Sequence, residues 1–353
     1  MSGKLRIGII GSGGIFNFGI GPIIRDLDFD LVAVADPQEE LVRERWNFRG
    51  FSIDVPFMDD YGDLISGDNV DAVLIGLPSH MHQRVTLECL EAGLHVLCEK
   101  PPTETVDEIV QVMDRVRQTG LVYQFVRQSR FGQMVRGLKQ LVDSGSLGNV
   151  YYAKTEWIRG RWFSEKGWRH DASKGGGVLL DLGIHAYDNV WYALGCPRPI
   201  EVMSTMNITF ADYAPENVEY TADDSTMAMI RFENGLLLCM EVAFSINTLG
   251  RYSTNGEMAS NVEWQKIFVY GDKGAYEDGK FLLGKKDGVD VDAIAHGPEV
   301  VPQVAQVKNF IESIEGSAGP VNTVEHAVQL MQVLEAAKKS AEQNKTIPIK
   351  QIV

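Results

Sequence analysis

The sequence has few cysteines, and their spacing excludes the usual cysteine motifs. Cys89, Cys98, Cys196 and Cys239 are four thiols in 353 residues, and no two of them form a CxxC pair. Cys98 lies in the apolar run HVLCEK, which is typical of a buried strand. We therefore expect reduced, structural thiols rather than a disulfide framework or a redox motif.

Positive charge is also scarce, because 48 Asp and Glu outnumber 33 Lys and Arg and give a formal net charge of -15 at pH 7. Nucleic acids and anionic membrane surfaces are polyanions, so we expect neither as a partner. Long apolar runs are missing too. The first segment, MSGKLRIGIIGSGG, has an apolar stretch too short for a signal peptide or a membrane span, and we expect a cytoplasmic protein.

What is present is the composition of a globular protein, with 44% hydrophobic and 23% charged residues, and a length that suits two domains. In the first third, short apolar runs alternate with amphipathic segments, which predicts a parallel sheet covered by helices. We expect an α/β dinucleotide-binding (Rossmann) domain over residues 1–125. The predicted strands are Leu5–Ile10, Asp30–Asp36, Asp71–Pro78 and His95–Pro101, and the predicted helices are Gln83–Gly93 and Val106–Gly120.

The remaining residues, 126–353, follow a different pattern. A β-rich run covers Gly148–Gly160, and Asn234-Gly235 between two further β-rich runs indicates a hairpin. This pattern predicts an α+β domain with an open, mainly antiparallel sheet that binds substrate and mediates oligomerisation. A helix predicted at about residues 323–343 is a candidate to pack back on the N-terminal domain.

A glycine-rich turn follows the first predicted strand. Gly11, Gly13 and Gly14 would let the backbone approach a pyrophosphate, which the free N–H groups of the next helix would bind. Phe16 stands where a third motif glycine is expected. Asp36 ends the second predicted strand 23 residues after Gly13, near the distance expected for an acid that binds ribose. The segment predicts a dinucleotide site, with a structural turn as the alternative.

The segment GGGVLLDLGIHAYD places Asp181, His185 and Asp188 at positions i, i+4 and i+7. On a helix these side chains share one face. They could be a packing detail, a metal site completed by His170, or part of an active site. Hydride transfer to a nicotinamide needs no metal when a base is present, so we expect no metal here. Asp188 is assigned a structural role.

The segment WIRGRWFSEKGWRH interleaves three tryptophans with three arginines. Such a mixture can stack on nucleic-acid bases. The acidic chain favours a pocket wall instead, because Trp faces pack on sugar C–H groups and Arg donates to hydroxyls. This segment therefore indicates a carbohydrate or a cyclitol.

Three motifs together resemble the glucose–fructose oxidoreductase / inositol dehydrogenase / MocA family over nearly the whole chain. They are the glycine turn, the block GLPSHMHQRVTLECLEAGLHVLCEKP that ends in Glu99–Pro101, and WRHDASKGGGVLLDLGIHAYD. The resemblance implies the family's two-domain fold and its use of NAD.

The resemblance also implies residue roles. The expected catalytic residues are Lys100, Asp181 and His185. The expected cofactor-binding residues are Gly11, Gly13, Gly14, Ile15, Asp36, Pro78, Glu99 and Lys100. The expected substrate-binding residues are Lys100, Gln128, Trp168, Arg169, Asp181 and His185. Gln128 stands where relatives often carry Asn, which lengthens this polar arm.

The chemistry agrees with these roles. Oxidising an alcohol requires a base for the hydroxyl proton, and histidine suits this with an ordinary pKa of ~6.5. The ammonium of Lys100 would stabilise developing alkoxide charge. We expect an NAD-dependent dehydrogenase acting on a secondary alcohol of a sugar or inositol-like polyol. The alternatives are an NAD(P)H-dependent keto-sugar reductase and a non-catalytic dinucleotide-binding sensor or regulator.

Apolar residues occupy both alternating positions of the predicted hairpin. Met227 and Met229 alternate with Ala228, Ile230 and Phe232. One face of such a sheet can cover the domain's own helices, and the other requires a partner. We therefore expect a homo-dimer or homo-tetramer formed through this sheet.

Overall fold

The computed structural model describes residues 4–12, 27–48, 50–160, 167–216, 218–247, 263–285, 288–293 and 300–352. The chain forms two compact units. Unit 1 combines Met1–Phe131 with Val300–Val328, and unit 2 combines Gly132–Glu299 with Gln329–Val353. The division into functional domains at residue 125 stays a prediction.

Unit 1 contains a six-stranded sheet of order β3-β2-β1-β4-β5-β6, in which every neighbouring pair is parallel. The strand order reverses direction between β1 and β4. The predicted Rossmann architecture is confirmed. The strands are β1 (Arg6–Ile10), β2 (Asp30–Ala35), β3 (Phe57–Met58), β4 (Ala72–Ile75), β5 (His95–Cys98) and β6 (Tyr123–Phe125).

Helices cover this sheet. On one face, Trp46 of α2 and Phe310 of α8 join Ile7 and Ile9 of β1 in one buried cluster. On the other face, α3 lies so close to β1 that a Cβ added at Gly8 would meet Leu64 at 2.9 Å. The helices of unit 1 are α2 (Glu39–Phe48), α3 (Tyr61–Ile65), α4 (Ser79–Glu91), α5 (Val106–Thr119) and α8 (Pro302–Glu315), and a 3-10 turn, η2, covers Gln128–Phe131.

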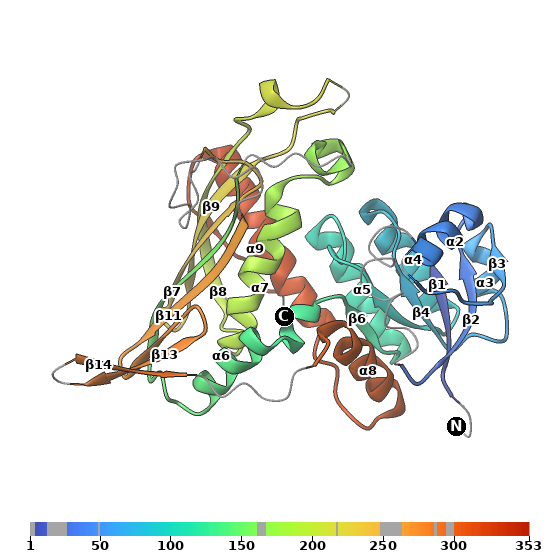
Figure 1. The fold of residues 1–353 in the computed structure, drawn as a ribbon, viewed down its shortest axis with the longest axis horizontal. Helices are drawn as coiled ribbons and strands as arrows, with labels where there is room; N and C mark the ends of the chain where they lie inside the picture. The colour runs from blue at the N-terminus through green and yellow to red at the C-terminus, as the bar shows by residue number, and fades with distance from the viewer. Residues whose placement is uncertain are drawn as a thin grey trace. The chain divides into compact units, whose positions relative to one another are not determined.

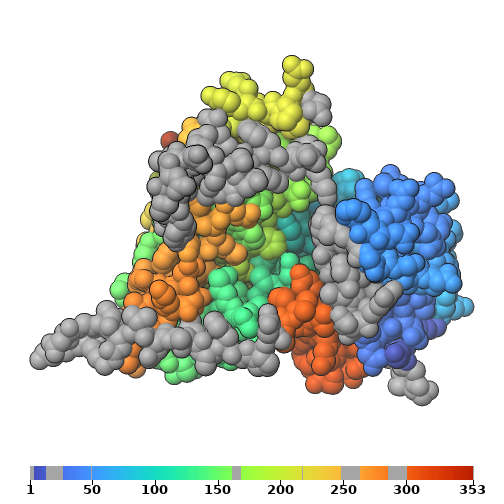
Figure 2. Space-filling view, in the orientation of Figure 1, coloured from blue at the N-terminus to red at the C-terminus, as the bar shows by residue number. Residues whose placement is uncertain are grey.

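α8 comes from a distant part of the sequence and was not predicted. Its residues follow nearly the whole of unit 2 along the chain, yet they complete the core of unit 1. Blue segments from the start of the chain and orange-red α8 are both visible in the space-filling view (Figure 2).

Unit 2 is built on a nine-stranded sheet of order β14-β13-β12-β11-β7-β10-β9-β8-β15. Only the pair β7–β10 is parallel among the described strands, so the predicted open, mainly antiparallel sheet is confirmed. The strands are β7 (Val150–Arg159), β8 (Pro199–Asn207), β9 (Ser225–Phe232), β10 (Leu237–Ala243), β11 (Glu263–Gly271), β12 (Gly274–Glu277), β13 (Lys280–Lys285), β14 (Gly288–Ala293) and β15 (Ile347–Pro348).

The helices of unit 2 lie on one side of the sheet, and Figure 1 shows no described helix on the other side. They are α6 (Gln133–Asp143), α7 (Ile184–Ala193) and α9 (Val324–Gln343), which begins in unit 1. Short helical turns are η3 (Gly167–His170), η4 (Ala172–Lys174), η5 (Leu179–Gly183) and η6 (Ala211–Tyr213).

The predicted hairpin joins β9 to β10, with Gly235 at φ 86 in its turn. Ala228 and Ile230 are buried beneath the helices, whereas Met227 and Met229 are 59% and 48% exposed. We call the side of the sheet that carries Met203, Met227 and Met229 the outer face.

Two further expectations concern the thiols and the membrane. Cys89 and Cys98 are buried free thiols, as predicted, and burial raises the pKa of both. Within the described part of the chain, every helix is too short or too polar to cross a bilayer.

Candidate active site

The predicted cofactor residues that the structure describes lie along one edge of the parallel sheet. Gly11, Asp36, Gly76 and Glu99 directly follow β1, β2, β4 and β5. The last residues of these strands pair in register, with Ile10 beside both Ala35 and Ile75, and Ile75 beside Cys98. This is the carboxyl edge, where open parallel sheets bind ligands at the point of strand reversal.

Gly11 occupies a position that only glycine suits. Its φ is 80, and an added Cβ would lie 2.7 Å from the Leu77 side chain and 3.0 Å from the backbone of Gly76. A Cβ at Gly76 would in turn lie 2.7 Å from the Gly11 carbonyl oxygen. The two strand ends therefore touch through bare backbone, which fits the start of a pyrophosphate-binding turn. Gly13, Gly14 and Ile15 lie outside the described residues, so their roles stay predictions.

Asp36 is held by the backbone around it. Its Oδ2 accepts a hydrogen bond from the Ser12 N–H at 2.8 Å, and its Oδ1 accepts one from the Gln38 N–H at 2.9 Å. These bonds fix the carboxylate beside the glycine turn. An acid at this place fits the ribose hydroxyls of a dinucleotide.

Arg43, the nearest candidate cation on α2, is bound elsewhere. Its guanidinium donates to Glu39 at 2.7 Å and to the carbonyls of Ile53 and Val55 at 3.3 and 3.1 Å. It also lies 4.4 Å from the centre of the Phe57 ring. These contacts hold the charge of Arg43 in the packing of α2.

Glu99 and Lys100 form the turn after β5. Glu99 is 5% exposed, and burial raises the pKa of its carboxyl. The Lys100 N–H donates a hydrogen bond to Glu99 at 3.1 Å. This bond and positive charge on Lys100, His82 and Arg127 oppose the effect of burial, because they act to lower the pKa of the Glu99 carboxyl. Lys100 itself is half-buried, and Pro78, at the start of α4, is exposed. The turn therefore combines a buried acid with a half-buried lysine.

Gln128 is the first residue of η2, just after β6, and its side chain is half-buried. Its Oε1 is buried and has no hydrogen-bond partner among the described residues. A buried carbonyl oxygen of this kind is costly unless something donates to it. Gln128 therefore remains a candidate to contact a bound molecule.

The helix that carries Asp181 and His185 differs from the expected one. Its first turn, η5, is a π-helix closed by a hydrogen bond from Ile184 N–H to the Leu179 carbonyl, and α7 follows it. The segment is not the single α-helix expected, because Asp181 lies in the π-turn whereas His185 and Asp188 lie in α7. That the three side chains share one face stays a prediction. Asp181 and His185 are half-buried and Asp188 is fully buried. Such π-turns are frequent at functional sites.

Trp168 and Arg169 lie beside Asp181. Arg169 forms an ion pair with Asp181 at 3.3 Å, and its guanidinium lies 5.0 Å from the Trp168 ring centre. Trp168 is 39% exposed. The structure thus brings together three of the predicted substrate-binding residues as an aromatic surface beside a charged pair.

His185 faces an aromatic side chain of the sheet. Its ring centre lies 5.7 Å from that of Trp157 on β7. Trp157 Nε1 donates to Glu263 at 2.6 Å, and Arg159 pairs with the same carboxylate at 3.1 Å. Glu263 was not predicted, because its partners lie more than a hundred residues away in the sequence and no motif marks it.

Asp223, also missed, anchors the start of the π-turn. Its Oδ2 accepts hydrogen bonds from the Leu179 N–H at 3.0 Å and from the Thr226 hydroxyl at 2.8 Å. A Cβ at Gly177, where φ is 116, would lie 2.0 Å from its Oδ1. The glycine before the helix therefore makes room for a buried acid that holds the helix in place.

The pH dependence of stability is expected to report on Asp223. Burial raises its pKa from 3.8 to about 6, so the native state binds this proton more tightly than the unfolded chain does. Stability therefore falls as the pH rises from about 4 to about 6. Relative to Asp223→Asn, the wild type should lose about 3 kcal/mol of unfolding free energy over this interval.

Thermal or denaturant unfolding of both proteins across this pH range measures the difference. Asp212→Asn, at an exposed position of η6, is the matched control and should follow the wild type. Parallel curves for the wild type and Asp223→Asn would contradict the assignment.

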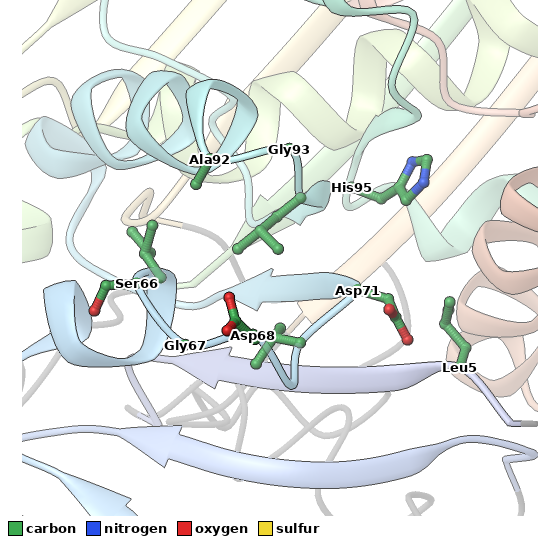
Figure 3. A pocket seen from close by; sticks show the side chains of 11 residues that line it. Leu5, Ser66, Gly67, Asp68, Asp71, Ala92, Gly93 and His95 are labelled. Carbon is green, nitrogen blue, oxygen red and sulfur yellow. The ribbon is translucent and has the colours of Figure 1, made fainter.

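A hollow of about 420 Å³ lies at the opposite, amino-terminal edge of the sheet of unit 1. Figure 3 shows Leu5, Asp71 and His95 around it, each at or just before the start of a strand. Asp71 is paired with Arg6 at 2.6 Å, and His95 Nδ1 accepts from the Val122 N–H at 2.9 Å. The polar groups of the hollow therefore serve the fold. No group of three or more potential metal ligands occurs in the described part of the chain.

Two oxidoreductase family models together match most of the chain. Residues 5–126 match a family model described as "Oxidoreductase family, NAD-binding Rossmann fold". Residues 139–349 match one described as "Oxidoreductase family, C-terminal alpha/beta domain". The Gly11 backbone contact and the Asp36 carboxylate lie within the first match, and Asp181 and His185 lie within the second.

Individual proteins and structures are also similar. D-glucoside 3-dehydrogenase of Escherichia coli (strain K12) is 30% identical over 262 residues, 70% of this chain and 72% of that protein. The scyllo-inositol 2-dehydrogenase (NADP(+)) IolW of Bacillus subtilis (strain 168) is 24% identical over 367 residues, 97% of this chain and 95% of its own. A structure of levoglucosan dehydrogenase with NADH shares the fold, with a TM-score of 0.81 at 19% identity over 99% of this chain and 100% of that one.

Proposed function

This chain belongs to the glucose–fructose oxidoreductase / inositol dehydrogenase / MocA family of oxidoreductases, and from that premise we propose that it oxidises a secondary alcohol of a sugar or an inositol-like polyol by hydride transfer to NAD. The N-terminal part is an NAD-binding Rossmann domain.

The exposure of His185 is the observation that carries this proposal. Its neighbours Ile184, Ala186 and Tyr187 are all 0% exposed, whereas His185 itself is only half-buried. A half-open imidazole in a buried helix can exchange a proton with a bound alcohol. Asp181, on the preceding turn, is open in the same way.

The proposed roles follow from these positions. His185 accepts the proton of the hydroxyl, Asp181 orients His185 or a neighbouring hydroxyl, and Lys100 stabilises the negative charge on the alcohol oxygen. NAD, when bound, accepts the hydride. The residues that would hold it are Gly11, Gly13, Gly14 and Ile15 at the pyrophosphate, Asp36 at the ribose, and Pro78, Glu99 and Lys100 at the nicotinamide half.

The substrate-binding roles proposed for Gln128, Trp168 and Arg169 favour a polyhydroxylated ring. Arg169 and the Gln128 amide donate hydrogen bonds to hydroxyls, and the exposed face of Trp168 packs on C–H groups. The dehydrogenases similar to this chain carry names of glucosides and inositols. Both lines support a pyranose or a cyclitol.

A panel of pyranoses and cyclitols incubated with the protein and NAD⁺ tests this function through the absorbance of NADH. We expect turnover with at least one cyclic polyol and none in the His185→Ala variant. If the protein binds NAD but reduces it with no cyclic polyol, the dehydrogenase proposal fails and the sensor alternative gains support.

The reverse reaction is the second candidate, because one similar protein is named as a reductase. The 1,5-anhydro-D-fructose reductase of Ensifer adhaerens is 28% identical over 184 residues, 52% of this chain and 53% of that protein. The same site would then donate a proton from His185 to a ketone. Oxidation of NADH or NADPH by keto-sugars measures this direction.

We also propose that the outer face forms a homo-dimer or homo-tetramer. Met203, Met227 and Met229 are each about half exposed there, and Met203 pairs with Met229 between β8 and β9, so exposed apolar side chains are grouped on this face and favour a partner. Light scattering at micromolar concentration should give a multiple of 39.2 kDa. The double substitution Met227→Lys, Met229→Lys should reduce the mass to that of one chain, because it buries like charges in the interface.

Phe48→Lys, which changes an 87% exposed apolar residue of unit 1, should leave the mass unchanged. A wild type that is monomeric at this concentration would contradict the proposed assembly.

A further inference from the structure

His82 is a buried histidine for which the proposed mechanism has no role. It lies in the first turns of α4 and is 1% exposed. Its Nδ1 is 2.7 Å from the Pro101 carbonyl oxygen, and its Nε2 is 2.9 Å from the Leu77 carbonyl oxygen. Each of the two ring nitrogens thus faces a backbone oxygen at hydrogen-bond distance.

These two contacts favour one charge state of the ring. Carbonyl oxygens only accept hydrogen bonds, and a neutral imidazole carries a single N–H. A neutral His82 would leave one nitrogen lone pair against a carbonyl lone pair in a buried place, which is unfavourable. The imidazolium, with an N–H on both nitrogens, satisfies both carbonyls.

A buried cation needs a counter-charge, and Glu99 supplies it. Glu99 is buried at the end of β5, and burial raises the pKa of its carboxyl, whereas a positive charge on His82 would act to lower it. Lys100 and Arg127 are the other cations that act on Glu99. A charged His82 would therefore join Lys100 and Arg127 in favouring the ionised form of this acid.

The two carbonyls belong to the two turns that border the candidate nicotinamide site. Leu77 precedes Pro78 after β4, and Pro101 directly follows Lys100 after β5. Pro101 has no N–H, so its carbonyl is the backbone group through which this end of the turn can be held. The Lys100 N–H is already held by Glu99.

We propose that His82 is a positioning residue, an imidazolium that ties the Lys100–Pro101 turn to the Leu77–Pro78 turn and so fixes the backbone from which the Lys100 side chain extends. This inference rests on the proposed role of Lys100. Its structural half, the doubly protonated ring, can be tested without any substrate.

The protonation state is measured first, by NMR of the full chain with ¹⁵N-labelled histidine, with and without NAD. Seven histidines are present, and the His82 signals are those lost in His82→Gln. We expect both ring nitrogens of His82 to carry a proton at neutral pH. A signal from one unprotonated ring nitrogen would overturn the imidazolium. This measurement needs no turnover, so it establishes the protonation state of His82 even if the proposed dehydrogenase function is wrong.

The positioning role is measured by turnover on the substrate identified in the polyol panel. His82→Gln can reach only one of the two carbonyls, and His82→Phe can donate to neither. We expect kcat to fall about 10-fold and about 100-fold, because small misplacements of a catalytic group have effects of this size. KM for the polyol should change by less than threefold. His80→Gln, at an exposed position of the same helix, should match the wild type.

A double variant shows whether His82 acts through Lys100. If it does, Lys100→Ala combined with His82→Gln should turn over no more slowly than Lys100→Ala alone, because the positioned group is already missing. A further 10-fold loss in the double variant would overturn the proposal, as would a kcat of His82→Gln within twofold of the wild type. His82→Gln retains a polar side chain, so these comparisons do not require the Phe variant to fold.

Discussion

Replacing His185 by Ala is expected to lower kcat by ~10²–10⁴-fold, the usual effect of losing a general base. Lys100→Ala is expected to lower kcat to a similar extent, because the charge on the alcohol oxygen then lacks its ammonium partner. The dissociation constant for NAD should change far less than kcat in either variant. Steady-state kinetics on the true substrate, together with NAD titration, measure both quantities.

Lys308→Ala is the matched control for Lys100, because it removes a lysine that is 68% exposed on α8 of the same unit. It should keep wild-type kcat. Near-normal turnover in Lys100→Ala or His185→Ala would show that the proton chemistry belongs to other residues.

NAD is expected to exceed NADP in kcat/KM by at least tenfold, or ~1.4 kcal/mol. Asp36 presents a carboxylate where the adenosine ribose should lie, and a 2′-phosphate there would place two negative charges in contact. Arg43 is engaged by Glu39 and the carbonyls of Ile53 and Val55, so it does not offset that repulsion. Asp36→Ala should reduce the preference. The measurement is kcat/KM with each cofactor, for both proteins.

Asp30→Ala is the control that tests whether the reduced preference for NAD is specific to the loss of Asp36. Asp30 is an exposed acid at the first residue of β2, whereas Asp36 follows its last residue. The control should keep the wild-type preference. Equal use of NADP by the wild type, or an unchanged preference in Asp36→Ala, would assign cofactor choice to other groups.

Local patterns predicted much of the architecture. The β-rich runs before Gly11, Asp36 and Lys100 are strands of one parallel sheet, and α5 has the expected ends. A capping box between Thr105 and Glu108 starts it, and Gly120 at φ 67 ends it. These features depend on a few adjacent residues, which is why sequence patterns detect them.

The features that escaped prediction depend on contacts between distant residues or on small differences in geometry. One π-turn differs from an α-turn by a single residue, which hydrophobic spacing over one turn does not resolve. The packing of α8 in unit 1 joins segments that are far apart in the sequence. The hydrogen bond from the Leu179 N–H to Asp223 does the same. His82 was quoted in the sequence only as part of a longer motif and was given no role. Its contacts with the carbonyls of Pro101 and Leu77 depend on the folded structure, and the sequence pattern does not show them.

The parallel pairing of β7 with β10 affects how unit 2 folds during its synthesis. These neighbours at the middle of the sheet, such as Tyr152 and Leu237, are about 85 residues apart, and β8 and β9 are made between them. On a ribosome, β7 waits with both edges unpaired until β10 and then β11 emerge. Pairing of distant segments is slow, and unpaired strand edges are prone to aggregate. The yield of soluble protein in expression should therefore be most sensitive to temperature and chaperone supply while residues 160–270 are being synthesised.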